Sequence, residues 1–138
     1  MTGVYAPELT REAIFRAPLN RRTFATSGPR MSIRFAVNGQ LMGGEVWKPA
    51  GNTRTVTARA LTCDPIETLE IIRNGQVARS AAGDGGRDVS LQWYDQDSLA
   101  PLAPARPVGD ERFAYSYLRV RTIYGDLGWS SQVGVHQA

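Results

Sequence analysis

Two periods of hydrophobic residues divide this chain, a helical one near its start and a period of two in the remainder. The helical segment follows Thr10, a good N-cap, and its apolar face begins at Ile14. Pro18 lacks an amide hydrogen and clashes with the preceding turn, so we expect the helix to stop near Ala17 or to bend there. The pattern therefore predicts one short N-terminal helix.

From Met31 onward hydrophobic and polar residues alternate, which is typical of half-buried β-strands. Asn38-Gly39 and Asn74-Gly75 interrupt the alternation, and the Asn-Gly dipeptide tolerates the positive φ angles of a type I′ hairpin turn. In residues 112–124 apolar side chains fall on both faces, which predicts a central strand. The expected strands are residues 23–26, 31–37, a segment that starts at 41, 53–61, 68–73, 76–81, 89–93, 112–124 and 129–135.

Seven to nine short strands joined by hairpin turns predict a mainly β fold, an antiparallel Ig-like β-sandwich preceded by one short helix. A small barrel is the alternative that the same pattern allows. Gly43-Gly44 indicates a bulge or a close backbone approach, and residues 48–52 and the proline-rich residues 95–110 are expected loops. A chain of 138 residues, 42% of them hydrophobic, is long enough to bury the core of one such domain.

The net charge of +3 comes mainly from arginine, because Lys48 is the only lysine among 16 basic residues. Arginine enrichment occurs in phosphate- and nucleic-acid-binding proteins, but a genomic bias that replaces lysine by arginine explains it more simply. No run of adjacent basic residues exceeds the pair Arg21-Arg22, and acids are interspersed throughout. Nucleic acid is therefore not expected as a partner.

Residues suited to catalysis are few. Cys63 and His136 are the only residues of their types, which argues against a disulfide, a Cys/His pair or a metal site within the chain. Asp95 and Asp97 lie in a polar, loop-like neighbourhood, so we expect solvated carboxylates and not a general acid–base pair. No apolar run approaches the ~18 residues of a membrane span, and no signal pattern opens the chain. The sequence predicts a soluble chain without catalytic or metal-binding residues of its own.

Two neighbouring segments carry a family resemblance, Thr10-Arg-Glu-Ala-Ile-Phe and Arg21-Arg-Thr-Phe-Ala-Thr-Ser-Gly-Pro-Arg30. They closely resemble a stretch of PHP-superfamily metal-dependent hydrolases, in the carbaryl-hydrolase-like group and its uncharacterised phosphoesterase-like relatives. In that group the stretch follows the last metal-binding Asp-x-His of a catalytic barrel, and a β-sandwich comes after it. Two weaker signatures of the group also match, Ile-Ile-Arg-Asn-Gly at residues 71–75 and Trp-Ser-Ser at residues 129–131.

The resemblance implies that residues 1–30 are the terminal helix and connecting strand of a catalytic barrel and that residues 31–138 are an accessory β-sandwich. The Asp-x-His and the other metal ligands are absent from this chain, so the divalent metals would belong to the parent barrel. The implied role is structural: packing on the barrel, shaping the rim of its active site, or forming a homo-oligomer contact. The residues expected at the junction, nearest to a substrate, are Arg22, Thr26, Ser27 and Arg30.

Without the barrel, the helix is expected to dock loosely on the sandwich or to be disordered. A rival hypothesis treats the chain as a stand-alone binding module for an anionic polymer, a carbohydrate or a protein. Its binding surface would combine Tyr115 and Tyr117 as stacking groups with Arg119 and Arg121 as an anion site. Cross-strand pairing of these arginines with acids is the plainer account.

Overall fold

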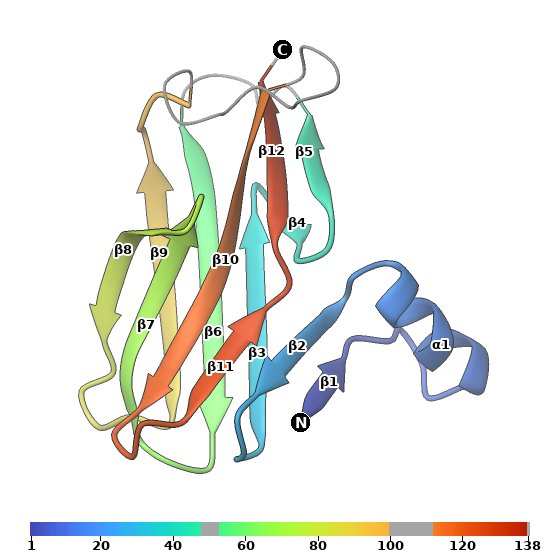
Figure 1. Cartoon of the computed structure of the whole chain (residues 1–138), viewed down its shortest axis with the longest axis vertical. Coiled ribbons are helices and arrows are strands. Elements are labelled where there is room, and N and C mark those ends of the chain that lie inside the picture. Colours follow the sequence, from blue (N-terminus) through green and yellow to red (C-terminus); the bar gives the residue numbers. More distant parts are fainter. Residues whose placement is uncertain (48–52, 100–111, 138) are drawn as a thin grey trace.

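One helix and twelve strand segments make up the computed structural model, which describes residues 1–47, 53–99 and 112–137 (Figure 1). The mainly β class predicted from the alternation is confirmed. The expected loop at 48–52 and residues 100–110 of the expected loop at 95–110 lie outside the described residues. In chain order the elements are β1 (Thr2–Val4), α1 (Arg11–Leu19), β2 (Thr23–Thr26), β3 (Met31–Val37), β4 (Gln40–Leu41), β5 (Glu45–Trp47), β6 (Arg54–Thr62), β7 (Ile66–Arg73), β8 (Gln76–Ala82), β9 (Asp88–Asp95), β10 (Arg112–Thr122), β11 (Leu127–Ser130) and β12 (Val133–Gln137).

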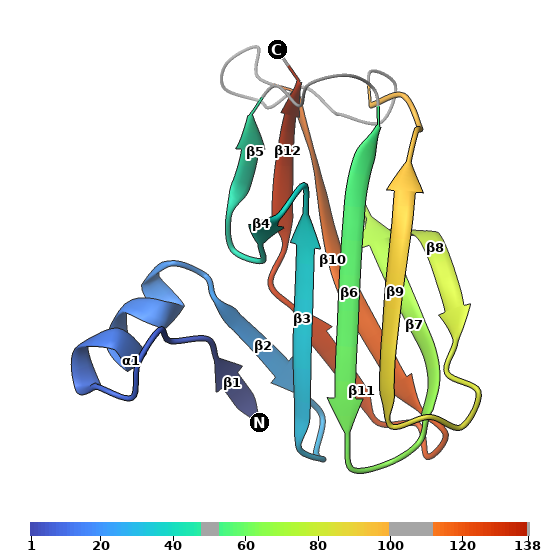
Figure 2. The same cartoon turned by 180° about the vertical axis from the view of Figure 1, so that it is seen from behind.

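The strands form two sheets that pack face to face (Figures 1 and 2). The smaller sheet has the order β4-β3-β6-β9 and is antiparallel throughout. The larger sheet is centred on β10, which pairs with β7 along one edge and with β11 and β12 along the other. The strand predicted to be central is therefore central.

The larger sheet divides where a single strand was expected. Residues 129–135 belong to β11 and β12, which lie end to end beside β10 with Ser131-Gln132 between them. From β11 the sheet continues to β2 and β1, whereas from β12 it continues to β5, which is parallel to it. We call this division the fork. The strand segments outnumber the seven to nine expected for two reasons. The strands β1 and β5, of three residues each, were not predicted as separate strands, and the fork splits one predicted strand into two.

The core lies between the two sheets and consists of the inward-facing side chains of both. In β3 the alternating residues expected in the core are buried, and Ala36, expected on the wet face, is only 9% exposed. Burying one large aliphatic side chain stabilises a fold by about 1.5–3 kcal/mol, so this layer is the main source of stability. The largest fully buried side chains include Phe35, Ile33, Met42, Ile66, Leu69, Ile71, Leu118, Val37, Val120 and Val133.

Both Asn-Gly dipeptides form the predicted turns. Asn38 and Gly39 have φ angles of 49° and 77°, and Asn74 and Gly75 have φ angles of 48° and 83°, as a type I′ turn requires. The side-chain oxygen of Asn38 accepts a hydrogen bond from the amide of Thr55 (2.8 Å). That of Asn74 accepts one from a β10 amide in the same way (3.1 Å). Each turn therefore also fixes its hairpin to the next strand of the sheet.

A cluster of charged side chains lies within the core and joins the two sheets. Asp95 is 2% exposed, and its Oδ2 accepts hydrogen bonds from Arg54 Nε of β6 (3.0 Å) and Arg73 Nη2 of β7 (2.6 Å). Arg73 also donates to Asp97 Oδ2 (3.1 Å) and lies over the Trp93 ring, 5.2 Å from its centroid. The expectation of a solvated Asp95 is wrong, because β9 extends beyond the predicted 89–93 and carries Asp95 inward two residues after Trp93. Asp97, with its side chain 61% exposed, is solvated as expected.

Candidate functional site

Helix α1 starts and ends through local hydrogen bonds. Thr10 Oγ1 accepts from the Ala13 amide (3.2 Å), which confirms the predicted N-cap. The helix passes Ala17, includes Pro18 and ends one residue later at Leu19. Arg21 then adopts a left-handed conformation (φ 56°) and closes the helix. No described helix is long and apolar enough to cross a membrane.

The end of α1 fits into the fork. A Cβ atom on Gly43 would lie 2.4 Å from the carbonyl oxygen of Asn20 and 2.5 Å from that of Arg21, so the two backbones are in direct contact, as Gly43-Gly44 predicted. The Gly43 amide donates to the Gln132 carbonyl (2.8 Å), and the Ser131 amide donates to the Thr23 carbonyl (2.9 Å). We call residues 20–23, 43–44 and 131–132 the seam. The segment that resembles PHP proteins and the Trp-Ser-Ser signature therefore meet in space.

A chain of polar contacts continues from the seam to His136. Arg21 Nη2 donates to Glu45 Oε1 (3.0 Å), and Glu45 Oε2 lies 3.1 Å from His136 Nε2. The imidazole is 3% exposed and stacks on Trp47 with ring centroids 3.7 Å apart. Phe113 stacks on it at 5.5 Å. With hydrogen on Nε2, His136 donates to Glu45, while its buried Nδ1 has no hydrogen-bond partner among the residues that the structure describes. The single histidine thus fixes β5 and β12 together, a role that its place near the end of the sequence did not indicate.

We expect Glu45→Gln to destabilise the protein at neutral pH by no more than about 1 kcal/mol, because the pair with Arg21 is partly exposed. The hydrogen bond from Arg21, and after it the contact with His136, hold the pKa of Glu45 below its usual value of 4.5, although burial opposes them. A carboxyl whose pKa is lowered by folding adds its full stability above the pKa of the unfolded state. This stability is lost as the pH falls through the folded-state pKa. Thermal unfolding midpoints of the two proteins should therefore converge below pH 4.5.

Glu67→Gln is the control for this prediction, because the Glu67 side chain is 54% exposed and lies 4.0 Å from Arg121. Its midpoint should follow that of the unmodified protein across the same pH range. A Glu45→Gln difference that does not change with pH would show that the carboxylate charge is not what stabilises the seam.

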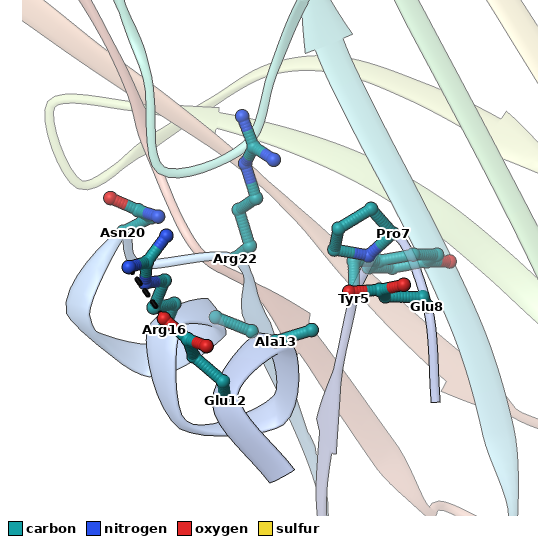
Figure 3. A pocket seen from close by; sticks show the side chains of 9 residues that line it. Tyr5, Pro7, Glu8, Glu12, Ala13, Arg16, Asn20 and Arg22 are labelled. Atoms are coloured by element: carbon teal, nitrogen blue, oxygen red, sulfur yellow. Dashed lines mark ion pairs between the residues drawn. The ribbon is translucent and has the colours of Figure 1, made fainter. Parts of the chain in front are cut away.

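A pocket of about 310 Å³ opens beside the seam, between α1 and the segment that precedes it (Figure 3). Glu12 and Arg16 form an ion pair on its helical side (2.6 Å), and both side chains are mainly exposed. Arg22 lies between this pair and Tyr5 and points away from the pair. The pocket can receive a polar group, but its acids are solvated and none is positioned by burial for proton transfer. Its lining residues are Tyr5, Pro7, Glu8, Glu12, Ala13, Arg16, Ala17, Asn20 and Arg22.

The four predicted junction residues are divided between the two ends of β2. Arg22 precedes the strand at the seam, whereas Thr26 ends it and Ser27 and Arg30 belong to the turn that follows. Buried Thr26 donates through Oγ1 to the Pro29 carbonyl (2.9 Å). Ser27 Oγ donates to an Asp126 carboxylate oxygen (3.1 Å). It also accepts a hydrogen bond from the amide of Leu127 (2.9 Å). Thr26 and Ser27 thus stabilise turns, and Arg30 is exposed.

The second predicted surface lies on the outer face of β10. Tyr115 and Tyr117 are half-buried there. Arg119 Nε donates to Glu70 Oε2 of β7 (2.7 Å), and Arg121 Nε lies 4.0 Å from Glu67 Oε2. Cross-strand pairing with acids, the plainer account, describes both arginines.

Metal ligands do not gather in the part of the chain that the structure describes. No group of three or more His, Cys, Asp or Glu side chains there is placed to hold a metal ion. Cys63 is exposed and is not joined to another cysteine. What the region around the seam offers chemically is therefore a packing surface and a polar pocket.

The chain is similar in sequence to part of several much longer proteins. An uncharacterised protein of Chlamydia pneumoniae is 31% identical over 142 residues, which cover 98% of this chain and 22% of that protein. Uncharacterised proteins of Chlamydia muridarum and Chlamydia trachomatis are 30% and 28% identical with the same coverage, so the chain spans about a fifth of the length of these curated relatives. No solved structure matches it. Residues 1–62 match the family described as "Protein of unknown function (DUF3604)", and the chain is similar to that family from β1 to β6, a range that includes α1 and residues 20–23 and 43–44 of the seam.

Proposed function

We propose that this chain is a non-catalytic accessory β-sandwich of a longer protein and that α1 attaches it to the remainder. Following the resemblance of residues 10–30, the longer protein is a PHP-like metal-dependent hydrolase whose barrel holds the divalent metals. The role of the chain is then structural, at or near the rim of the active site. The observation that carries the attachment is the direction in which α1 points its large apolar side chains.

Large apolar side chains of α1 face solvent, among the charged residues Arg11, Glu12 and Arg16. Only Ala13 and Ala17, one helical turn apart, are buried against the chain. Phe15 and Leu19, also one turn apart, are each 70% exposed on the opposite side, and Ile14 beside them is 40% exposed. An amphipathic helix normally buries its large apolar residues against its own core. Here the arrangement is reversed, as it is when the partner of a helix lies elsewhere.

The seam supports this role because it holds α1 in one orientation. Figures 1 and 2 show α1 at the side of the sandwich, beyond β1, with its length projecting away from both sheets. Contact with Gly43 fixes the C-terminal end of the helix, while its docked face is limited to small alanines. A helix held in this way presents its apolar side chains to a neighbour without an additional loss of conformational entropy on binding.

The rival, a stand-alone module that binds through Tyr115, Tyr117, Arg119 and Arg121, has less support because both arginines lie against acids. The reading frame upstream of Met1 discriminates between the two. A continuous frame that encodes His-x-His and Asp-x-His motifs supports the accessory role. A translation start at Met1 with no such region upstream contradicts it.

We expect the double variant Phe15→Gln, Leu19→Gln to bind the remainder of the longer polypeptide at least about tenfold more weakly, because two large apolar side chains no longer leave water on docking. Glutamine favours helix, so the free energy of unfolding of the chain itself should change by less than about 0.5 kcal/mol. Calorimetric titration of the separately expressed pieces and urea denaturation measure the two quantities.

The matched control is Val77→Gln, Tyr124→Gln, two exposed apolar side chains, 50% and 72% exposed, away from α1. Its affinity should equal that of the unmodified chain. Equal affinities for the α1 variant and the control would contradict the docking role of α1. A stable homodimer formed through α1 would instead show that α1 mediates self-association. Robust metal-dependent phosphodiesterase or arylesterase turnover by the 138-residue chain would contradict its non-catalytic role.

A further inference from the structure

The outer face of the smaller sheet carries an ordered array of polar side chains. Figure 2 looks onto this sheet, in which β3, β6 and β9 lie side by side. The register aligns its residues in rows across the three strands, and the central row is Arg34, Arg59 and Ser90. The other rows of this polar face are Ser32, Leu61 and Asp88; Ala36, Thr57 and Gln92; and Thr55 with Tyr94.

Two arginines in this array lie directly opposite each other. Arg34 and Arg59 are partners in the β3–β6 register, and like charges placed directly opposite in a sheet are destabilising. Arg59 is compensated, since it donates through Nε and Nη2 to the two carboxylate oxygens of Asp88 (2.8 and 2.6 Å). This pairing raises the pKa of Arg59 and lowers that of Asp88. Arg34 is exposed and makes no ion pair within the described residues, so one positive charge of the row is left to solvent.

The arginine pair also lies between two hollows. One, of about 380 Å³, runs toward β9 over short side chains that include Thr57 and Ser90. The other, of about 240 Å³, lies on the opposite side of the pair and is bounded by Tyr5 and Ser32, whose hydroxyl oxygens are 3.2 Å apart. Both are lined by Arg34 and Arg59. A guanidinium with an open hollow on each side is accessible to an anion that lies flat on the sheet.

We propose that this face, which we call the β3–β6–β9 platform, binds an anionic sugar, a hydroxylated ring that bears a carboxylate, sulfate or phosphate. Arg34 receives the anion, because the planar guanidinium forms paired hydrogen bonds with such groups. Hydroxyl and amide groups of Thr57, Ser90 and Gln92 are spaced along the same hollow and suit sugar hydroxyls. Tyr94 ends the array, 61% exposed and joined through its hydroxyl to Gln92 Nε2 (3.0 Å), and offers its ring for stacking.

The composition of the platform favours a sugar over a nucleic acid or an apolar partner. Its charge is +1, from Arg34 and Arg59 against Asp88, whereas a nucleic acid requires several cations along the phosphate backbone. Leu61, 48% exposed, is the only large aliphatic side chain among its rows, so a protein that binds through hydrophobic contacts would find little to bury. The site lies on another sheet from the β10 surface predicted from sequence, and it does not depend on the attachment role of α1.

The test titrates the 138-residue chain, as expressed, by calorimetry and ¹⁵N NMR with three probes: an oligogalacturonate, a heparin-derived oligosaccharide and glucose 6-phosphate. We expect binding of at least one probe, with amide shifts on β3, β6 and β9, that weakens as ionic strength rises. Arg34→Gln should reduce the affinity at least about tenfold, because it removes a charge-assisted hydrogen bond. Thr57→Glu should abolish binding by placing a carboxylate diagonal to Arg34.

Arg79→Gln provides the matched control, since it removes the same charge from β8 of the other sheet and should leave the affinity unchanged. Equal thermal midpoints for all variants show that folding is not the cause of any loss. No binding by the three probes, equal loss in Arg79→Gln, or equal affinity for an uncharged maltooligosaccharide would each overturn the proposal. Tighter, Arg34-dependent binding of a short DNA duplex would overturn it in favour of nucleic acid.

Discussion

Asp95→Ala is expected to lower the free energy of unfolding by about 3–5 kcal/mol, because it removes the buried carboxylate that two buried guanidinium groups share. Arg54 and Arg73 are 4% and 6% exposed, so water cannot replace the lost partner. The cluster also joins β6 and β9 of one sheet to β7 of the other, and its loss weakens the contact between sheets. Urea denaturation followed by tryptophan fluorescence measures the change, and Trp93 beneath Arg73 reports locally.

Asp97→Ala is the matched control for the ion cluster. It removes a carboxylate from the same arginine, but its side chain is 61% exposed, so we expect a loss below about 1 kcal/mol. If the two variants are equally stable, burial of Asp95 does not determine the strength of the cluster.

Gly43→Ala is expected to cost about 3 kcal/mol, the sum of an unfavourable left-handed backbone and a clash with backbone atoms. Gly43 has a φ of 89°, and the new Cβ would meet the Asn20 and Arg21 carbonyl oxygens at 2.4 and 2.5 Å. Because those carbonyls belong to the helix cap, relief of the clash requires α1 to move away from the fork. Circular dichroism melts and amide exchange along residues 11–22 should report both the lost stability and the released helix.

Gly39→Ala separates the two contributions. Gly39 has a similar φ of 77°, but a Cβ there meets nothing within 4 Å, so this variant carries only the backbone penalty of about 1–2 kcal/mol. Equal losses for the two alanine variants would mean that the seam yields without resistance, and α1 would then be held by its alanines alone.

Local patterns predicted most of the fold. Alternation located β3 and β6, and the Asn-Gly dipeptides located both type I′ turns, because strand burial and positive φ angles are properties of adjacent residues. The end of β9 was missed, because whether Asp95 lies inside depends on Arg54 and Arg73, which arrive from other strands. No residue-level signal near Asp95 distinguishes a buried ion pair from a solvated loop.

The candidate site was predicted in part for the same reason. The apolar residues of α1 follow from the sequence, but the side of the helix that faces the sandwich is decided by the seam. Gly43-Gly44 correctly indicated a close backbone approach, while the fork was hidden because Ser131-Gln132 contains no turn-forming glycine or proline. Arg22, which the sequence placed at the junction, lines a pocket, yet nothing in the sequence indicated that Arg34 and Arg59 would be direct cross-strand partners.

The fork also gives the molecule a mechanical property. Helix α1 is connected to the sheet by two routes, through β2 to β11 and through Gly43 and Glu45 to β12. The two routes touch at the seam and both reach β10, where β11 and β12 pair with different halves of the same strand. We therefore expect a tilt of α1 to displace β11 and β12 together, and through them both halves of β10.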